Sequence, residues 1–228
     1  MNSSPFGTTS NGVKAALYTL ENSNHTIVKV TDFGATLVSI LFKDNSGNVK
    51  DVILGYDVVA DYEKNTCFFG ATIGRNGNRI KDGKFKINGV EYSIEQNENE
   101  NNLHSGSHGF HNRLWEVKSY TDNSIEFFHH SPEEEQGFPG DMDITVKFTI
   151  DDEDTLHIEY DAKADKDTVM NFTNNTYYNL GGHDSGTIYD QTLQLMSDTY
   201  NPVIDPKSIP TGENASVKGT PMDFTEPK

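Results

Sequence analysis

The sequence has 228 residues, which is enough for one large domain or two small ones. Its 35 acidic and 18 basic side chains give a formal net charge of −17, which repels phosphate backbones and anionic lipid and argues against binding to nucleic acid through a basic patch. The 13 Phe and 10 Tyr residues distinguish the chain from a disordered one, and the single cysteine, Cys67, excludes an internal disulfide.

The amino-terminal residues, Met-Asn-Ser-Ser-Pro, lack the basic and apolar regions of a signal peptide. No apolar run reaches the length of a membrane span. We therefore expect a cytoplasmic protein that does not enter a membrane.

Most of the predicted elements are strands, because apolar and polar residues alternate between turns of Gly, Asn and Asp. In chain order, we expect strands at residues 27–30, 37–42 and 52–54, a short helix at 58–65, a hairpin at 85–94, a strand at 124–129 and a hairpin at 142–162. The first hairpin turns at Asn88-Gly89, a pair that suits a type I′ turn. We therefore expect an all-β protein, a large antiparallel β-sandwich or a closed β-structure, in a single domain.

Three histidines, His104, His108 and His111, have the spacing i, i+4, i+7, which would align them on one face of a helix. Gly106 and Gly109 argue against a helix, because each glycine costs about 1 kcal/mol in a helix interior. No glutamate stands where a zinc-dependent hydrolase has its base. We expect no metal site, and we interpret His108 and His111 as incidental residues of a glycine-rich surface loop.

Two other segments are rich in polar groups that can bind hydroxyls. In the first, residues 73–80, a strand ends in a polar turn, and its glycines lack the spacing of a phosphate-binding loop. Asn78 and Arg79 in this turn offer fixed donors for neutral hydroxyls, although an arginine that caps a loop carbonyl explains Arg79 equally well. The second segment, residues 171–183, combines amide and phenol groups with apolar residues, which suits a carbohydrate.

These segments and their order resemble the aldose 1-epimerases, also called galactose mutarotases. The resemblance covers essentially the whole chain, and the matching segments are residues 30–35, 52–56, 74–80, 102–106, 109–110, 115, 137–140, 173–180, 182–186, 209–213 and 219–224. It implies a galactose mutarotase-like supersandwich that interconverts the α- and β-anomers of free hexoses such as galactose and glucose. It also implies that no cofactor is needed.

The resemblance implies acid and base catalysis of ring opening. A base removes the proton of the anomeric hydroxyl while an acid protonates the ring oxygen, and the ring closes again after rotation about C1–C2. Each positioned group of this kind contributes about 10²- to 10⁴-fold to the rate. By matching motifs, the residues expected around the sugar are Asn78, Arg79, His104, Asn175 and Tyr177, with His104 close to the ring oxygen.

The sequence departs from the family pattern in two ways. The family reads Thr-Asn-His-Thr-Tyr where this chain has Thr-Asn-Asn-Thr-Tyr at residues 173–177, so Asn175 replaces the usual general-acid histidine. An amide can hydrogen-bond the ring oxygen but cannot deliver a proton. The family's aspartate and base glutamate lie in strands that would follow Lys228. We therefore expect residues 1–228 to be the N-terminal two thirds of a single family domain, incomplete at its C-terminus, with little activity alone.

Two alternatives remain beside the mutarotase. The first is a non-catalytic carbohydrate-binding or regulatory protein on the same fold, which Asn175 favours. The second is a relative that acts on phosphorylated hexoses. Such a site needs clustered basic residues, and only Arg75, Arg79 and Arg113 lie near these motifs, which disfavours it. The sequence indicates neither the preferred aldose nor the oligomeric state.

Overall fold

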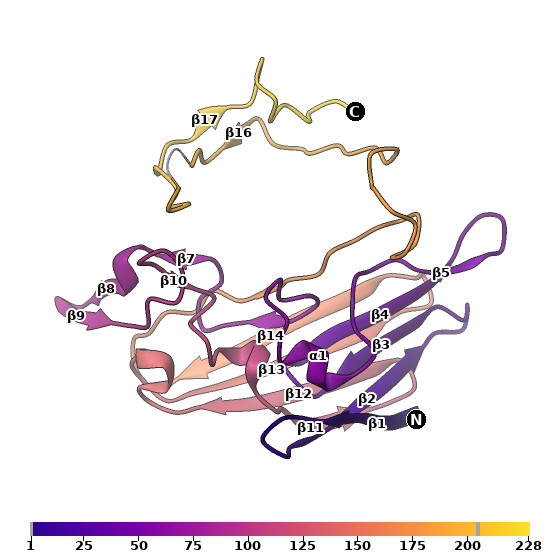
Figure 1. Cartoon of the computed structure of the whole chain (residues 1–228), viewed down its shortest axis with the longest axis horizontal. Coiled ribbons are helices and arrows are strands. Elements are labelled where there is room, and N and C mark those ends of the chain that lie inside the picture. The colour runs from indigo at the N-terminus through magenta and orange to yellow at the C-terminus, as the bar shows by residue number, and fades with distance from the viewer. Residues whose placement is uncertain (1, 204–205) are drawn as a thin grey trace.

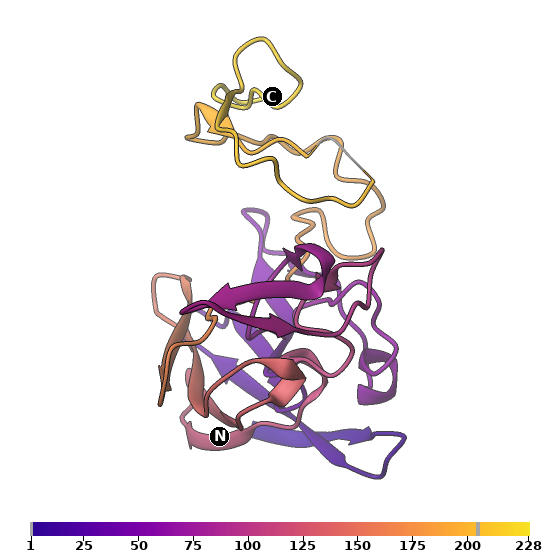
Figure 2. The same cartoon turned by 90° about the vertical axis from the view of Figure 1, so that its left-hand side faces the viewer.

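Two antiparallel sheets form the body of the protein in the computed structural model, which describes residues 2–203 and 206–228 (Figures 1 and 2). The first sheet follows chain order and contains β1 (Asn2–Thr8), β2 (Lys14–Glu21), β3 (Ile27–Thr31), β4 (Thr36–Lys43) and β5 (Val49–Asp51). The second also follows chain order and contains β11 (Glu116–Tyr120), β12 (Ser124–Ser131), β13 (Met142–Ile150) and β14 (Leu156–Ala164). The predicted all-β fold class is confirmed.

The core lies between these two sheets. Strand β13 shows why its sequence forms a strand, since its residues from Met142 to Ile150 alternate between buried and more exposed positions. The buried side chains of both sheets form one apolar cluster, and Tyr18 of β2 meets Phe127 of β12 with their ring centroids 5.9 Å apart. The main contributors are Leu20, Val28, Val30, Leu37 and Ile40 from the first sheet and Ile125, Phe127, Ile144, Val146 and Phe148 from the second.

Shorter elements complete the fold, and the strands of residues 79–103 lie beside one end of the sandwich, at the left of Figure 1. Strand pairs form between β6 (Thr72–Ile73) and β15 (Thr173–Asn174), between β7 (Arg79–Ile80) and β10 (Asn102–Leu103), and between β8 (Lys84–Ile87) and β9 (Val90–Ser93). The helical pieces are α1 (Val59–Tyr62) and the 3₁₀ turns η1 (Lys81–Gly83), η2 (Phe110–Asn112) and η3 (Glu135–Gly137). These pairings bring the segments around residues 72–80, 102–112 and 173–175 together.

Several element predictions need correction. The strand expected at 52–54 is wrong: β5 ends at Asp51, and Ile53 instead forms an isolated bridge with Tyr178. The helix expected at 58–65 is only the single turn α1, followed by hydrogen-bonded turns. Strand β1 was not predicted because its residues are mostly polar and exposed, as is common for an edge strand.

The buried side chain of Arg75 fastens the segment after β6 to the second sheet. Arg75 is 2% exposed. Its guanidinium donates to the carbonyls of Ser131, Pro132 and Pro139 at 2.7, 3.0 and 2.9 Å, and its Nε donates to Ser131 Oγ at 2.9 Å. These bonds replace the water that a buried cation loses. They fix the start of the polar turn that leads to Asn78.

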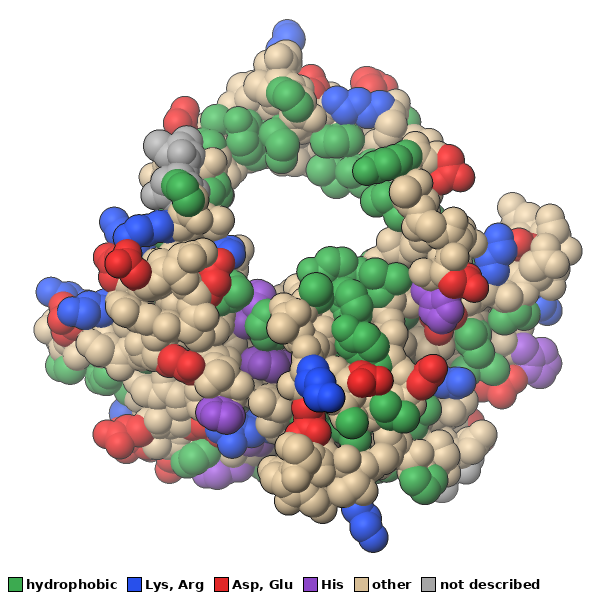
Figure 3. Space-filling view, viewed as in Figure 1, with side chains coloured by type: hydrophobic (Ala, Val, Ile, Leu, Met, Phe, Trp, Pro, Cys, Tyr) green, Lys and Arg blue, Asp and Glu red, His purple; other side chains and the backbone are tan. Residues whose placement is uncertain are grey.

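The last part of the chain forms an arm that extends away from the sandwich, drawn in orange to yellow (Figures 1 and 2). It carries one short strand pair, β16 (Thr199–Tyr200) with β17 (Ala215–Ser216). The space-filling view shows an opening between the arm and the sandwich, with apolar side chains on both of its borders (Figure 3). The exposed large apolar side chains of this part of the chain are Leu180, Ile188, Tyr189, Leu193, Leu195, Met196, Val203 and Met222. Among residues 2–203 and 206–228, none of the helices is long and apolar enough for a membrane crossing.

Candidate active site

His104 and Asn78 are locked together by two backbone-mediated hydrogen bonds. Leu103 pairs with Arg79 across β10 and β7, and the His104 N–H donates to the Asn78 carbonyl at 3.1 Å. In return, the Asn78 N–H donates to His104 Nδ1 at 3.0 Å. The φ angles of His104 and Asn78 are positive, 53° and 64°, so the backbone turns sharply at each of these residues. The structure therefore brings together three of the residues that the sequence indicated.

The same bond fixes the tautomer of His104. Because Nδ1 accepts a hydrogen bond, the proton of the neutral ring resides on Nε2. Burial and, to a smaller extent, the positive charge of Arg79 together lower the pKa of His104 to about 4. His104 is therefore a neutral imidazole near pH 7 that presents an N–H donor at Nε2.

Phe68 connects two of the three histidines. The rings of His104 and His111 each meet the Phe68 ring edge-on, with centroids 4.8 Å apart in both pairs. Burial lowers the pKa of His111 to about 4, and its Nδ1 has no hydrogen-bond partner within the described part of the chain. His108 is exposed. Phe68 was missed because no spacing in the sequence links it to the histidines.

The loop that carries the histidines packs closely against the turn after β6. A Cβ atom added at Gly74 would lie 2.3 Å from the Phe110 ring, so a larger residue would push this ring away. The ring of Trp115 lies 5.5 Å from that of Phe110, and its Nε1 donates to the Phe110 carbonyl at 3.2 Å. The loop is not a continuous helix, as the glycines indicated, because only η2 interrupts its turns. Among residues 2–203 and 206–228, no three His, Cys, Asp or Glu side chains form a group that could hold a metal ion.

Asn175 is hydrogen-bonded to the short segment that carries Phe68. Its Nδ2 donates to the Cys67 carbonyl at 3.0 Å, and its own carbonyl accepts from the Gly70 N–H at 3.0 Å. One of the two amide protons is therefore engaged, while Oδ1 and the second proton remain for a ligand. The Cys67–Gly70 segment thus joins Asn175 to His104 through Phe68.

Tyr177 is the fifth residue that the sequence indicated. Its side chain is 44% exposed, and its ring lies edge-on to Phe69 with centroids 5.1 Å apart. Phe69 directly follows Phe68, so the ring that Tyr177 contacts lies on the same segment as the ring that His104 contacts. An exposed phenol on an apolar support can stack on a sugar ring and donate to its hydroxyls.

Arg79 pairs with a carboxylate that the sequence analysis missed. Arg79 Nε and Nη2 donate to the two carboxylate oxygens of Glu98 at 3.0 and 2.8 Å, and Arg79 Nη1 contacts Asn78 Oδ1 at 3.4 Å. This bonding raises the pKa of Arg79 and lowers the pKa of Glu98. The alternative that Arg79 caps a loop carbonyl does not match these contacts, all of which go to side chains.

The other two arginines near the motifs are also engaged. Arg75 is buried by its bonds to the second sheet. Arg113 Nη2 lies 3.2 Å from a carboxylate oxygen of Glu135, and the His129 Nε2 lies 3.2 Å from the other oxygen. These contacts leave little cationic surface for a phosphate, in agreement with the low rank that the sequence gave to phosphorylated hexoses.

The amides of residues 171–183 serve mainly to fasten the backbone, which corrects the expectation that they line a cleft together. Asn171 donates to the Gly77 carbonyl at 3.0 Å, Asn174 to the Gly70 carbonyl at 2.9 Å, and Asn179 to Ser185 Oγ at 3.2 Å. Asn175 is the member of this group that lies beside Phe68. The sequence could not separate these roles, because all four residues are amides in one run.

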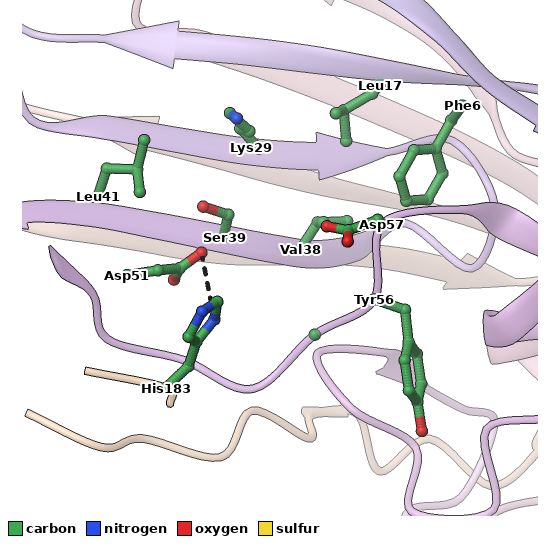
Figure 4. A pocket seen from close by; sticks show the side chains of 11 residues that line it. Phe6, Leu17, Lys29, Val38, Ser39, Leu41, Asp51, Tyr56, Asp57 and His183 are labelled. Atoms are coloured by element: carbon green, nitrogen blue, oxygen red, sulfur yellow. Dashed lines mark ion pairs between the residues drawn. The ribbon is translucent and has the colours of Figure 1, made fainter. Parts of the chain in front are cut away.

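The last histidine of that segment lies in a different concave region. His183 Nδ1 is 3.9 Å from a carboxylate oxygen of Asp51, in a groove on the outer face of the first sheet that also contains Lys29, Ser39 and Tyr56 (Figure 4). None of the five expected site residues lines this groove. The candidate site is therefore the region around His104 and not this groove.

The chain matches the family model described as aldose 1-epimerase over residues 16–228. A galactose mutarotase from Pongo abelii is 40% identical over 200 residues, which are 88% of this chain and 58% of that protein. An aldose 1-epimerase from Escherichia coli (strain K12) is 35% identical over 212 residues, 93% of this chain and 61% of that protein. The chain thus spans about three fifths of the length of these relatives.

Solved structures show the same likeness. A GalM/aldose epimerase homologue from C. elegans superposes with a TM-score of 0.88 at 32% identity, covering 94% of this chain and 65% of that one. A galactose 1-epimerase from Lactobacillus acidophilus NCFM superposes with a TM-score of 0.87 at 30% identity, covering 100% of this chain and 66% of that one. The fold is therefore an all-β sandwich of the galactose mutarotase-like kind. The chain belongs to the aldose 1-epimerase family.

Proposed function

We propose that this protein is an aldose 1-epimerase, an isomerase that interconverts the α- and β-anomers of free hexoses such as galactose and glucose. The observation that carries the proposal is the His104–Asn78 pair, which fixes an uncharged N–H donor at Nε2. The relatives named galactose mutarotase and aldose 1-epimerase support the same reaction. Ring opening and closing requires acid and base groups of the protein and no cofactor.

The proposal gives each site residue a role. His104 donates from Nε2 to the ring oxygen, which stabilises the negative charge that develops there as the C1–O bond breaks. Asn78 and Arg79 bind hydroxyls, Asn175 hydrogen-bonds near the ring oxygen, and Tyr177 supports one face of the sugar. Because its pKa of about 4 keeps His104 neutral, it polarises the oxygen at neutral pH, and the proton that the ring oxygen takes up as the C1–O bond breaks comes from an acid that is not among these five residues.

We also propose that residues 1–228 belong to a single aldose 1-epimerase-like domain. The support is that one family model matches continuously from residue 16 to residue 228, across both sheets and the arm. The proposal assigns the base to none of the five site residues.

A non-catalytic sugar-binding protein is the second candidate function. It is favoured by Asn175, whose amide stands where the family pattern has an acid and whose Nδ2 is held by the Cys67 carbonyl. This alternative keeps the same ligand and the same contacts but predicts no turnover.

Polarimetry on the chain extended to the full length of the family members separates the two candidates. An aldose 1-epimerase accelerates the decay of optical rotation of fresh α-galactose above the buffer rate, and His104→Gln slows it about 10²-fold or more. The matched control is His108→Gln, an exposed imidazole in the same loop, which leaves the rate unchanged. Decay at the buffer rate, together with saturable galactose binding, would favour the non-catalytic protein.

The single cysteine provides an independent readout of where the sugar binds. Cys67 is exposed, its carbonyl accepts from Asn175, and it precedes Phe68. Galactose bound at this site should therefore slow the reaction of the Cys67 thiol with a disulfide reagent such as dithionitrobenzoate. An unchanged thiol reaction at saturating galactose contradicts the proposed site, and the absence of any galactose binding contradicts both candidate functions.

A further inference from the structure

The Arg79–Glu98 pair has the geometry of a two-point ion pair. Both Arg79 Nε and Nη2 reach separate oxygens of the same carboxylate, at 3.0 and 2.8 Å. The two side chains are only 21% and 27% exposed. A bidentate pair in this setting holds the guanidinium in one plane and in one direction.

Glu98 is itself held in place and is not a mobile loop residue. Its backbone forms an isolated bridge with Asn101, with N–H to carbonyl distances of 3.1 and 2.8 Å. Asn101 is fully buried, and its side chain accepts from the Asp82 N–H and donates to the Lys207 carbonyl. The backbone of Glu98 is therefore fixed at this place, and the two bonds from Arg79 orient its carboxylate.

The groups that directly surround Asn78 and His104 carry no net charge at neutral pH. Arg79 and Glu98 cancel each other, and His104 and His111 are uncharged because burial lowers their pKa values to about 4. Asn175 and Tyr177 contribute amide and phenol groups. A site with hydroxyl-binding groups and no net charge suits an uncharged ligand.

We propose that Glu98 is an internal counter-ion that positions Arg79 and makes the site select uncharged aldoses over hexuronates, in which C6 is a carboxylate. This inference rests on the proposed function and adds the residue that sets its substrate class. Glu98 occupies two donors of Arg79, and a ligand carboxylate at the same guanidinium would lie beside a second negative charge. Removing the charge of Glu98 would leave Arg79 as an uncompensated cation, and its paired N–H donors could then bind a ligand carboxylate through two parallel hydrogen bonds.

The same geometry gives Glu98 a positioning role toward Asn78. Arg79 Nη1 lies 3.4 Å from Asn78 Oδ1. Because Glu98 fixes the orientation of the Arg79 guanidinium, it also orients the side-chain amide of Asn78 beside His104. Glu98 is a positioning residue in this account, because its contacts are with Arg79 and not with the sugar.

The test compares Glu98→Gln with the wild-type chain by calorimetric titration of galactose and of galacturonate. We expect galactose affinity to fall by no more than about threefold, and the ratio of galacturonate to galactose affinity to rise by about tenfold or more, since one unpaired charge at hydrogen-bonding distance is involved. This rise in the ratio of galacturonate to galactose affinity should become smaller in high salt, which a purely structural change would not cause.

Glu100→Gln is the matched control. It lies two residues away, removes the same charge, and pairs with Lys207 instead of an arginine of the site. We expect its affinity ratio to equal that of the wild type. Glu98→Asp, which keeps the charge on a shorter side chain, should also keep the preference for galactose, so that charge and side-chain length are separated.

The outcomes distinguish this inference from the function on which it rests. Wild-type binding of galactose with an unchanged ratio in Glu98→Gln overturns the role of Glu98 and leaves the proposed function standing. An equal shift in Glu98→Asp and Glu98→Gln also overturns it, because charge is then not the cause. Failure of the wild type to bind galactose overturns the proposed function and this inference together.

Discussion

At His104, a single backbone N–H decides the chemistry of the side chain. The bond from Asn78 to Nδ1 places the proton on Nε2, and burial between Phe68 and the turn before β7 keeps the ring uncharged. A free histidine has a pKa of about 6.5 and changes both charge and tautomer near neutral pH. His104 changes neither until the solution is strongly acidic, which makes it a constant donor.

This shift of the His104 pKa predicts how stability depends on pH. The folded-state pKa is about 4 and the unfolded value is about 6.5, so between these values the unfolded chain binds more protons. The contribution of the neutral His104 to the free energy of unfolding is therefore fully present above about pH 6.5 and is lost as the pH falls toward 4. His111 acts in the same direction, because its pKa is also lowered to about 4.

Urea unfolding at pH 7 and pH 5 checks this prediction. The free energy of unfolding should fall on acidification by less in His104→Gln than in the wild type, because that variant lacks one of the two buried imidazoles. His108→Gln, which replaces an exposed imidazole, should behave like the wild type. An equal loss in all three proteins would contradict the lowered pKa of His104.

Replacing Asn175 should change both the free energy of unfolding and the affinity for galactose. Asn175→Ala removes the donor to the Cys67 carbonyl, so we expect a loss of about 1 kcal/mol in the free energy of unfolding. If Asn175 also contacts the sugar, galactose affinity should fall about tenfold, as one lost hydrogen bond of about 1.4 kcal/mol predicts. Thermal melts and calorimetry measure the two effects separately. Thr173→Ala, an exposed residue on the adjacent β15, serves as the control and should change neither quantity by much.

At the scale of elements, the brace formed by Arg75 connects the polar turn after β6 to the end of β12 and the loop before β13. Replacing Arg75 with Met leaves three carbonyls and the Ser131 hydroxyl without their donors in a buried place. We expect a loss of about 3 kcal/mol or more in the free energy of unfolding, measured in urea. Lys147→Met removes the same charge from an exposed position on β13 and should cost less than about 0.5 kcal/mol. Equal losses in the free energy of unfolding of the two variants would show that the hydrogen bonds of Arg75 do not stabilise the fold.

Elements with regular alternation could be predicted from the sequence, and elements without it could not. Strand β13 (Met142–Ile150) begins where the predicted hairpin begins, because one of its faces is buried along its whole length. Strands β1 and β5 each pair with the strand next to them in the chain, but they contain few apolar residues, so no alternating pattern marks them. The failed strand at 52–54 shows the same limit, since its apolar residues are buried in a single bridge and not in a ladder.

The candidate site divides in the same way. His104, Asn78 and Arg79 could be identified because they stand in recognisable motifs, and the pairing of β7 with β10 brings them together. Phe68 and Glu98 carry no motif and acquire their roles only from tertiary contacts. The tautomer of His104 could not be predicted from the sequence either, because it depends on the direction of the Asn78 N–H bond.

At the scale of the whole molecule, the excess of acidic groups affects stability. The net charge is −17 at pH 7, and acidic loops such as residues 151–154 place several carboxylates close together on the surface. The ion pairs at the surface are mostly exposed and contribute little individually. Like charges on a compact body repel one another, and unfolding relieves part of this repulsion.

Added salt should therefore stabilise the protein at neutral pH. Raising NaCl from about 10 mM to about 100 mM shortens the screening length from about 30 Å to about 10 Å, which weakens repulsion between separate acidic loops. We expect the melting temperature to rise by about 2–4 °C, the change that about 1 kcal/mol produces in a domain of this size. KCl should act as NaCl does, because screening depends on ionic strength. Near pH 4.7, the isoelectric point given by the sequence, the excess charge disappears and the rise with salt should vanish. A rise of the same size at both pH values would mean that the salt acts by a route other than charge repulsion.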